Sequence, residues 1–106
     1  MIIIDGKNLT IEDVVRVARG FEKVKLSKEA IENVKKSREI VEKIISKKDR
    51  AVYGVNTGFG ELANVRISDE KLDELQKNLI RSHSCGIGKA LERDVVRAMM
   101  VLRCNS

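Results

Sequence analysis

The hydrophobic and polar positions of the chain predict a mainly α-helical protein with a short β element near its N-terminus. Three consecutive isoleucines at positions 2–4 precede Asp5 and Gly6, which is typical of a short strand followed by a tight turn. Residues 8–9 are expected to return as its partner strand. Weak alternation of apolar and polar residues predicts another short strand at residues 24–26.

A first helix is predicted after Thr10, a residue type that commonly caps helix N-termini. Asp13 follows at the spacing of a capping box. The residues expected on the buried face recur at helical spacing: Ile11, Val14, Val15 and Ala18. Gly20 is the expected stop signal.

The longest periodic segment begins at Ser27, which we expect to cap a second, amphipathic helix. Its apolar positions are Ala30, Ile31, Val34, Val41, Ile44 and Ile45. The opposite face carries Lys and Glu three or four residues apart, where opposite charges support one another. Lys47, Lys48 and Arg50 are expected at its C-terminal end, where the helix dipole favours positive charge.

Two more helices are predicted in the second half of the chain. The first begins near Ser68, and its apolar stripe is Leu72, Leu75, Leu79 and Ile80, with His83 on the same stripe. Gly86 and Gly88 are expected to end it. The last helix, from about residue 89, is apolar almost all round. Such a helix needs more partner surface than 106 residues offer, so we expect further sequence or oligomeric neighbours to cover it.

Composition and charge exclude several classes of function. The net charge is +5, but Lys and Arg alternate with Glu and Asp, and only 3% of residues are aromatic, which disfavours nucleic-acid binding. No apolar run is long enough to span a membrane, and residues 1–5 are too short for a signal peptide, so a cytosolic protein is expected. Cys85 and Cys104 lack metal-binding spacing and are expected to be free thiols.

The glycine-rich run AVYGVNTGFG at residues 51–60 is the main candidate for chemistry. It places Tyr53, the only tyrosine, among glycines 54, 58 and 60. Such a run is unlikely to form a regular element and predicts a loop after a brief strand at residues 51–52. From these residues alone, Tyr53 is either a base that the loop brings to a ligand or a tyrosine that packs.

The order and spacing of three segments resemble the N-terminal part of the histidine ammonia-lyase family. These segments are AVYGVNTGFG, then ELANVRIS at residues 61–68, then LQKNLIRSHSCGIG at residues 75–88. The resemblance covers residues 1–106 and is specific from Val52 onward. It implies the N-terminal part of the helical, aspartase-like ammonia-lyase fold, with a lid loop at residues 51–67 and a pocket helix at residues 68–86.

The resemblance also implies roles for individual residues. Tyr53 matches the base that removes the β-proton of the substrate, and Gly60 matches a position whose backbone lies beside the substrate. Ser82 and His83 match the pair that selects the substrate side chain, and Ser-His favours a polar aromatic amino acid, L-histidine or tyrosine. Weaker candidates are Asn56, Thr57 and Phe59 for shaping the loop and Asn105 for supporting the site, whereas Arg66 and Arg81 are expected at the surface or a subunit interface.

One departure from the family pattern concerns the methylidene-imidazolone (MIO) electrophile. It forms from an Ala-Ser-Gly tripeptide, which this sequence lacks. The chain is therefore expected to be inactive alone and to need the remainder of a homotetrameric enzyme. Its expected function is as the N-terminal part of a histidine ammonia-lyase that converts L-histidine to trans-urocanate and ammonia. A tyrosine ammonia-lyase or aminomutase, or a non-catalytic accessory or split subunit, is the alternative.

Overall fold

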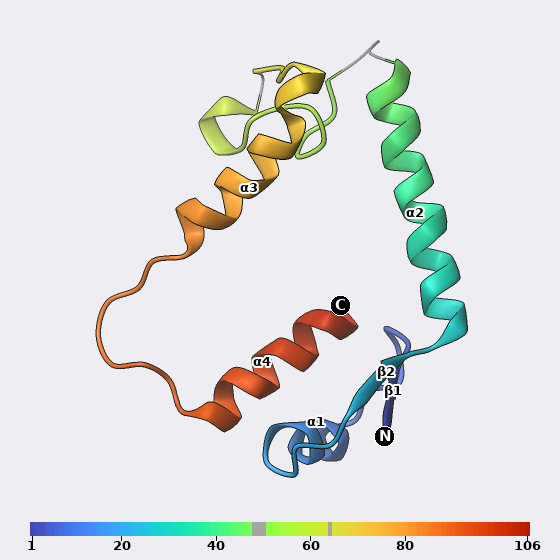
Figure 1. The fold of residues 1–106 in the computed structure, drawn as a ribbon, viewed down its shortest axis with the longest axis vertical. Coiled ribbons are helices and arrows are strands. Elements are labelled where there is room, and N and C mark those ends of the chain that lie inside the picture. Colours follow the sequence, from blue (N-terminus) through green and yellow to red (C-terminus); the bar gives the residue numbers. More distant parts are fainter. Residues whose placement is uncertain (48–50, 64) are drawn as a thin grey trace. The chain divides into compact units, whose positions relative to one another are not determined.

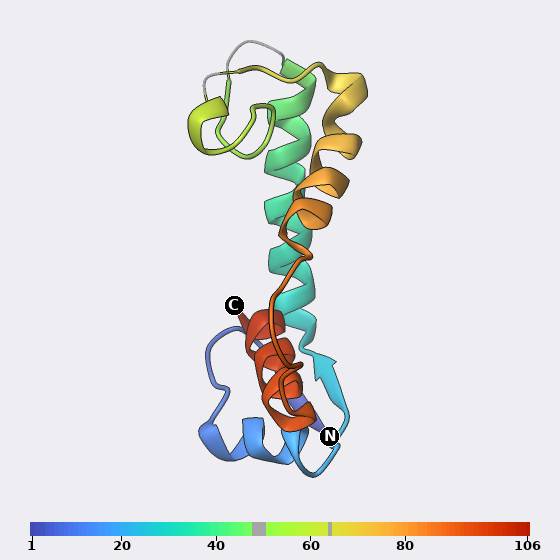
Figure 2. The same ribbon diagram turned by 90° about the vertical axis from the view of Figure 1, so that its left-hand side faces the viewer.

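The computed structural model describes residues 1–47, 51–63 and 65–106, which form two compact units. The first unit combines the two ends of the chain, residues 1–35 and 88–106, and the second contains the described residues between them. Figures 1 and 2 show the ribbon from two directions. Each unit has its own internal packing.

Two short parallel strands begin the first unit (Figure 1). β1 (Ile2–Ile4) pairs with β2 (Val24–Leu26), and Ile3 lies opposite Lys25. Both predicted strands are confirmed, but the return strand expected at residues 8–9 is wrong. Parallel neighbours need a long crossover connection, and here a helix lies between the two strands in the sequence.

The side chain of Asp5 explains why the chain does not return as a hairpin. Its carboxylate accepts the backbone N–H groups of Lys7 (2.8 Å) and Asn8 (2.9 Å) and the side-chain amide of Asn8 (2.5 Å). The turn uses these two backbone donors, so they are not available to a strand ladder. The same bonds lower the pKa of Asp5 to about 2, with the Asn8 backbone N–H as the largest cause.

The crossover helix α1 (Ile11–Ala18) begins at the predicted capping box. The Thr10 hydroxyl accepts the Asp13 N–H at 3.1 Å, and the Asp13 carboxylate accepts the Thr10 N–H at 3.2 Å. The helix ends shortly before Gly20, as predicted. The left-handed backbone conformation falls one residue later, on Phe21, with φ 53°.

The buried face of α1 agrees only in part with the predicted one. Of the predicted face, Ala18 is buried and Val14 is half-buried, whereas Ile11 and Val15 are 80% and 44% exposed. Val17, which was not predicted, is buried. Val14 and Val17 are also at helical spacing, so the hydrophobic pattern alone allows either face. Packing against α4 (Arg93–Asn105) selects the face that contains Val17.

The core of the first unit is small and aliphatic. Its buried members are Ile2, Ile4, Val17 and Val101, and Leu9 and Val14 pack against them. Because Val101 belongs to α4, residues from both ends of the chain share this core.

The last helix starts later than the predicted position near residue 89. The backbone of Glu92 is still extended, with ψ 149°, and its carbonyl accepts the first helical bond from the Val96 N–H at 3.1 Å. Val101 is the buried residue of α4. The large apolar residues that remain exposed on it are Val95, Val96, Met99, Met100 and Leu102.

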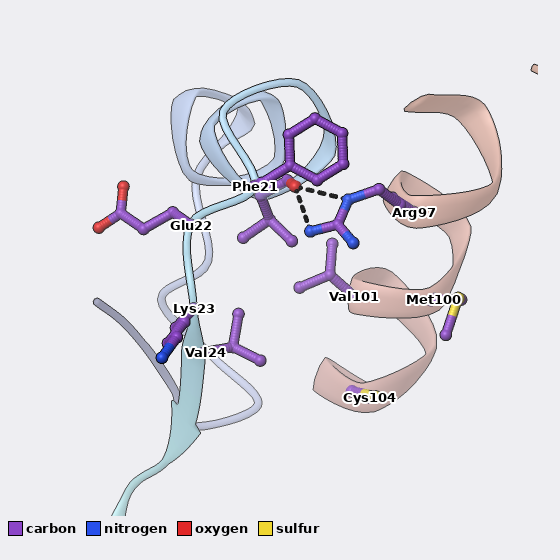
Figure 3. A pocket seen from close by; sticks show the side chains of 9 residues that line it. Phe21, Glu22, Lys23, Val24, Arg97, Met100, Val101 and Cys104 are labelled. Carbon is purple, nitrogen blue, oxygen red and sulfur yellow. Dashed lines mark hydrogen bonds between the residues drawn. The ribbon is translucent and has the colours of Figure 1, made fainter. Parts of the chain in front are cut away.

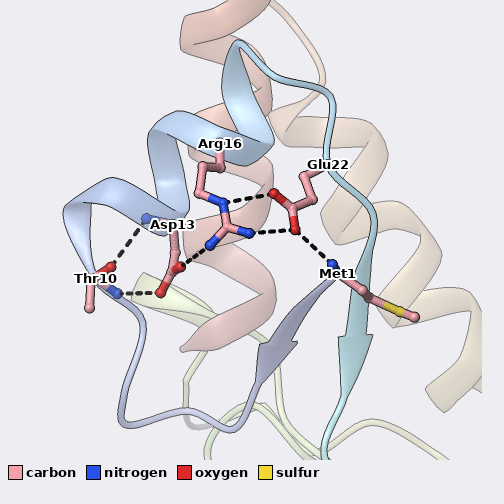
Figure 4. Close-up of polar contacts among 5 residues, drawn as sticks. All are labelled: Met1, Thr10, Asp13, Arg16 and Glu22. Carbon is pink, nitrogen blue, oxygen red and sulfur yellow. Dashed lines mark hydrogen bonds and ion pairs between the residues drawn. The ribbon is translucent and has the colours of Figure 1, made fainter.

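A network of ion pairs joins the start of β1 to α1 and to the segment that follows it (Figure 4). Arg16 donates two hydrogen bonds of 2.7 Å to Glu22 and lies 3.5 Å from Asp13. Glu22 also accepts a 2.7 Å bond from the α-ammonium group of Met1. The Met1 ammonium group and then Arg16 lower the pKa of Glu22, and hydrogen bonds from Thr10 lower the pKa of Asp13.

The long helix α2 (Lys28–Lys47) begins at the predicted cap. The Ser27 hydroxyl accepts the Ala30 N–H at 3.0 Å. No residue of α2 is buried, and its apolar stripe is half-buried or exposed along its whole length. Lys48 and Arg50, expected at the C-terminal end of this helix, lie outside the described residues.

The second unit contains a loop and the helix that follows it. Two short 3-10 helices, Gly60–Leu62 and Asp69–Lys71, lead into α3 (Leu72–His83). The predicted stripe of α3 is buried or half-buried at Leu72, Leu75 and Leu79, whereas Ile80 is 68% exposed and His83 is also exposed. The α-helix thus begins and ends inside the predicted 68–86 range.

The residues that the structure describes bear on membrane crossing, metal binding and the state of the cysteines. Among these residues, none of the helices combines the length and the apolar character that crossing a membrane requires. The same residues contain no group of three or more His, Cys, Asp or Glu side chains arranged to hold a metal ion. Cys85 and Cys104 are both exposed and free.

Candidate functional site

The predicted glycine-rich loop begins with a tight turn around Tyr53. The N–H groups of Val55 and Asn56 lie 3.0 and 3.2 Å from the Val52 carbonyl oxygen. In return, the side-chain oxygen of Asn56 accepts the Val52 N–H at 2.7 Å. Gly54 has φ +74°, which glycine adopts without a steric penalty. The brief strand predicted at the start of the loop is therefore wrong.

Backbone hydrogen bonds close the loop on itself. The Gly58 N–H donates to the Val65 carbonyl at 3.0 Å, and the Ile67 N–H donates to the Asn56 carbonyl at 2.7 Å. These contacts lie within the lid loop predicted at residues 51–67. The described part of this segment is thus held by its own hydrogen bonds.

The interior of the loop is polar and tightly packed. Asn56 and Thr57 are each only 1% exposed, and Thr57 forms an isolated antiparallel bridge with Arg66. A Cβ atom at Gly58 would lie 2.6 Å from the Cβ of Leu62 and 2.7 Å from its carbonyl oxygen. Only glycine fits there without a shift of the neighbouring backbone.

The ring of Tyr53 packs edge-on against Phe59. The two ring centroids are 5.7 Å apart, and the ring planes meet at 79°, a favourable arrangement for aromatic pairs. The Tyr53 hydroxyl oxygen accepts the Gly60 N–H at 3.5 Å. Since Tyr53 is 62% exposed, these contacts orient its ring and leave it open to an approaching ligand.

A side chain from α3 contacts this turn directly. The amide nitrogen of Gln76 donates to the carbonyl oxygen of Gly54 at 3.3 Å. Gly54 follows Tyr53 in the sequence. The loop and α3 are therefore linked beside the candidate base.

A cavity of about 350 Å³ lies between the loop and α3. Phe59 lines it from the loop, and Leu79, Ser82 and His83 line it from the helix. Phe59 is also the ring against which Tyr53 packs. The structure thus brings the sequence-predicted residues Tyr53, Ser82 and His83 to one region of the second unit.

The hydrogen bonds of His83 indicate which tautomer it adopts. Nδ1 lies 2.8 Å from the Leu79 carbonyl oxygen and 3.0 Å from the Ser82 hydroxyl. A carbonyl oxygen only accepts, so we assign the proton to Nδ1, which makes Nε2 the acceptor of the neutral ring. Although the sequence places His83 on the apolar stripe of α3, the structure exposes it at the end of the helix. It is not a buried core histidine.

The two arginines expected at the surface or an interface, and the weaker candidate Asn105, have other contacts. Arg81 donates to the side-chain oxygen of Asn78 at 3.1 Å, on the exposed surface of α3. Arg66 takes part in the loop bridge already described. Asn105 accepts the Gly6 N–H at 3.0 Å within the first unit, so the contact described for it stabilises the turn after β1.

The first unit contains a separate groove of about 400 Å³ (Figure 3). Arg97 crosses it, donating from Nε and Nη2 to the Val17 carbonyl oxygen at 3.0 and 2.9 Å. Phe21, Met100 and Val101 also line it. None of the four sequence-predicted site residues lines this groove.

Sequence reasoning does not identify Gln76 as a contact of the loop. The available signal is its spacing, because Gln76 lies seven residues before His83 and residues at that interval share one face of a helix. A polar residue on the face that carries the candidate pair is therefore a reason to expect a contact. The pattern does not specify the Gly54 carbonyl as its partner.

The fold and the site define the class of protein. A mainly helical chain carries a tyrosine on a glycine-rich loop, beside a helix that ends in a Ser-His pair. The family model for aromatic amino acid lyases matches residues 9–106. The chain belongs to the aromatic amino acid lyase family.

Individual relatives agree with this family assignment. The chain is 53% identical over 106 residues to histidine ammonia-lyase 2 of Fusobacterium nucleatum subsp. nucleatum, covering all of this chain and 20% of that protein. It is 53% identical over 105 residues to the histidine ammonia-lyase of Caldanaerobacter subterraneus subsp. tengcongensis, covering 99% of this chain and 20% of that protein.

A solved structure supports the fold independently. The crystal structure of tyrosine aminomutase from Streptomyces globisporus matches with a TM-score of 0.90 and 41% identity, over 98% of this chain and 20% of that one. The chain corresponds to the N-terminal part of such enzymes and spans about a fifth of their length. The predicted fold, mainly helical with a short β element, is confirmed.

Proposed function

We propose that this chain provides part of the active site of a histidine ammonia-lyase, which eliminates ammonia from L-histidine and forms trans-urocanate. The observation that carries this proposal is the packing of Tyr53 against Phe59, because Phe59 also lines the cavity bordered by Ser82 and His83. A group able to accept a proton and a pair able to recognise a side chain thus belong to one compact unit. The identity to histidine ammonia-lyases supports the same reading.

Tyr53 is the proposed base that removes the β-proton of the substrate. A base needs access to the substrate, and the ring of Tyr53 is largely exposed. The Gly60 N–H is directed at the Tyr53 hydroxyl oxygen and would stabilise negative charge there. A Cβ at Gly60 would meet no atom within 4 Å, so space for a substrate lies beside its backbone.

Ser82 and His83 are the proposed recognition pair. With its Nδ1 proton directed to the Leu79 carbonyl, neutral His83 offers Nε2 to an N–H or O–H group of the substrate. The imidazole N–H of L-histidine meets this requirement. We rank histidine first because the two relatives named above, at 53% identity, are histidine ammonia-lyases.

A tyrosine ammonia-lyase or aminomutase is the second candidate. The O–H group of a phenol could donate to Nε2 of His83 as an imidazole N–H could. The 41% identity to a tyrosine aminomutase supports this alternative. Both readings assign the same residues to the same roles and differ in the substrate.

The electrophile of the reaction is not supplied by this chain. The family characteristically uses a methylidene-imidazolone, which makes the substrate amine a leaving group and forms from an Ala-Ser-Gly tripeptide that this sequence does not contain. Nor do the described residues lining the cavity beside Ser82 and His83 provide an equivalent group. The proposed contribution of this chain is proton removal and substrate recognition, and the proposed partner is the remainder of a homotetrameric enzyme.

A chimaeric enzyme tests this function. This chain would replace the matching segment of the Fusobacterium nucleatum enzyme, and urocanate formation from L-histidine would be followed by its ultraviolet absorbance. We expect turnover, and we expect Tyr53→Phe to lower kcat by about 10²- to 10⁴-fold with little change in substrate binding. Ser37→Ala removes a hydroxyl group from the exposed surface of α2 and serves as the control. An unchanged kcat in Tyr53→Phe would refute the assignment of the base.

The chain by itself gives the complementary measurement. We expect no urocanate from the 106-residue chain at any protein concentration. Activity of the chain alone would contradict our account of the electrophile. Activity that returns when the separately produced remainder of the relative is added would indicate that the two parts can assemble as split subunits.

A further inference from the structure

We propose that Asn56 is the positioning residue for Tyr53, fixing the turn that presents the tyrosine ring. This inference rests on the proposed role of Tyr53 as the base. Asn56 is 1% exposed, so it reaches neither solvent nor an incoming substrate directly. It would act on the reaction through the backbone on which Tyr53 is carried.

The hydrogen bonds of Val52 show how Asn56 holds the backbone at Tyr53. Val52 directly precedes Tyr53, and both of its backbone polar groups are bonded to Asn56. The Val52 N–H donates to the Asn56 side-chain oxygen at 2.7 Å, and the Val52 carbonyl accepts the Asn56 N–H at 3.2 Å. These two bonds run in opposite directions between the same two residues. They close a hydrogen-bonded ring of backbone that includes Tyr53, which restricts rotation of the Tyr53 backbone.

Asn56 is itself anchored to the wall of the cavity. Its carbonyl oxygen accepts the Ile67 N–H at 2.7 Å, and Ile67 lines the cavity that Ser82 and His83 border. The turn that carries Tyr53 is therefore tied, through one buried residue, to the region proposed to hold the substrate. A small displacement of a reacting group strongly lowers the reaction rate. We therefore expect this connection to affect catalysis.

Two other hydrogen bonds near Tyr53 are longer and exposed to solvent. The Gln76 amide reaches the Gly54 carbonyl at 3.3 Å, and the Gly60 N–H reaches the Tyr53 hydroxyl at 3.5 Å. Exposed and longer bonds compete with water and constrain less than the short, partly buried bond from the Val52 N–H to the Asn56 side chain. The Asn56 side chain thus constrains the position of Tyr53 more than either of these two bonds does.

Two substitutions in the active chimaera test this inference. Asn56→Leu keeps a similar volume and removes the acceptor, whereas Asn56→Asp keeps an oxygen that can accept the Val52 N–H. We expect Asn56→Leu to lower kcat at least about tenfold while KM changes less than about threefold, because the substrate-recognition pair is untouched. Asn56→Asp should retain several-fold more kcat than Asn56→Leu. Asn33→Leu, the same substitution on the exposed surface of α2, should leave both constants unchanged.

Hydrogen exchange supplies a readout that does not depend on a substitution. In the unsubstituted chimaera, the Val52 amide should exchange slowly, because its partner is a buried side chain. In Asn56→Leu it should exchange at least about tenfold faster. Rapid exchange of this amide in the unsubstituted enzyme would overturn the inference even if neither Asn56 variant folds.

The two proposals fail in different ways. If Tyr53→Phe leaves kcat unchanged, Tyr53 is not the base, and the proposed role of Tyr53 fails together with the inference built on it. If Tyr53→Phe abolishes turnover while Asn56→Leu keeps the kcat of the unsubstituted chimaera, only the positioning role of Asn56 fails. A fall in kcat for both, with KM nearly constant and fast exchange at Val52, is the expected result.

Discussion

The guanidinium group of Arg97 lies 4.5 Å from the centre of the Phe21 ring. The same group donates two hydrogen bonds to the Val17 carbonyl, one of the last carbonyls of α1 and thus without a partner inside that helix. A positive charge is also favourable at the C-terminal end of a helix. The Arg97 side chain of α4 therefore supplies hydrogen-bond donors to the C-terminal end of α1. It also covers Phe21, the residue after α1 that has a left-handed backbone conformation.

Arg97→Ala should destabilise the first unit by about 2–3 kcal/mol, since it removes charge-assisted hydrogen bonds and a cation–π contact. Arg97→Lys should lose less, because it keeps the charge but not the paired donors. Urea unfolding followed by circular dichroism measures both. Arg93→Ala, at an exposed position of α4, is the control, and equal effects at positions 93 and 97 would contradict the prediction.

Gly58→Ala should distort the loop, because the added Cβ would lie 2.6 Å from the Cβ of Leu62. We expect a loss of stability of about 1–3 kcal/mol and a lower kcat in the chimaera, since Phe59 follows directly. Gly86→Ala is the matched control, because a Cβ there meets no atom within 4 Å and its backbone angle is ordinary. Thermal unfolding and turnover of the two variants, compared side by side, decide the point.

Acid should weaken the first unit partly through Asp5. Its pKa is lowered from 3.8 to about 2, so the folded state favours the ionised carboxylate. The stabilisation is present above the unfolded pKa of 3.8 and is lost as the pH falls through the folded value near 2. Asp5→Asn, which cannot titrate, should show a weaker pH dependence of the unfolding midpoint in that window. Parallel curves for the two proteins would argue against this contribution.

His83→Leu in the chimaera should change substrate preference. Loss of the Nε2 acceptor leaves a substrate imidazole N–H without its partner, so kcat/KM for L-histidine relative to L-phenylalanine should fall by roughly 10- to 100-fold. His83→Gln retains an acceptor oxygen and should preserve part of the preference. The ratio is obtained by measuring both substrates with each variant. An unchanged ratio in His83→Leu would remove His83 from the recognition pair.

Short-range patterns determined most of the secondary structure. Thr10 and Ser27 cap their helices as their positions predict, because each cap is completed by an N–H group three residues away. The strands at residues 2–4 and 24–26 were likewise evident from local composition. The candidate residues Tyr53 and His83 could be named from the motifs that contain them. Their catalytic and recognition roles remain predictions.

Only the tertiary structure decided which elements meet. The partner of β1, the buried face of α1 and the contact of Gln76 with Gly54 each depend on residues distant in the sequence. Arg97 lies 80 positions from its acceptor Val17, and no local period records such a pairing. The sequence by itself thus determined where helices, strands and motifs occur, because those depend on neighbours a few residues away. Long-range packing determined which surfaces they bury and which side chains they bring together, because an apolar stripe fits more than one partner until the chain has folded.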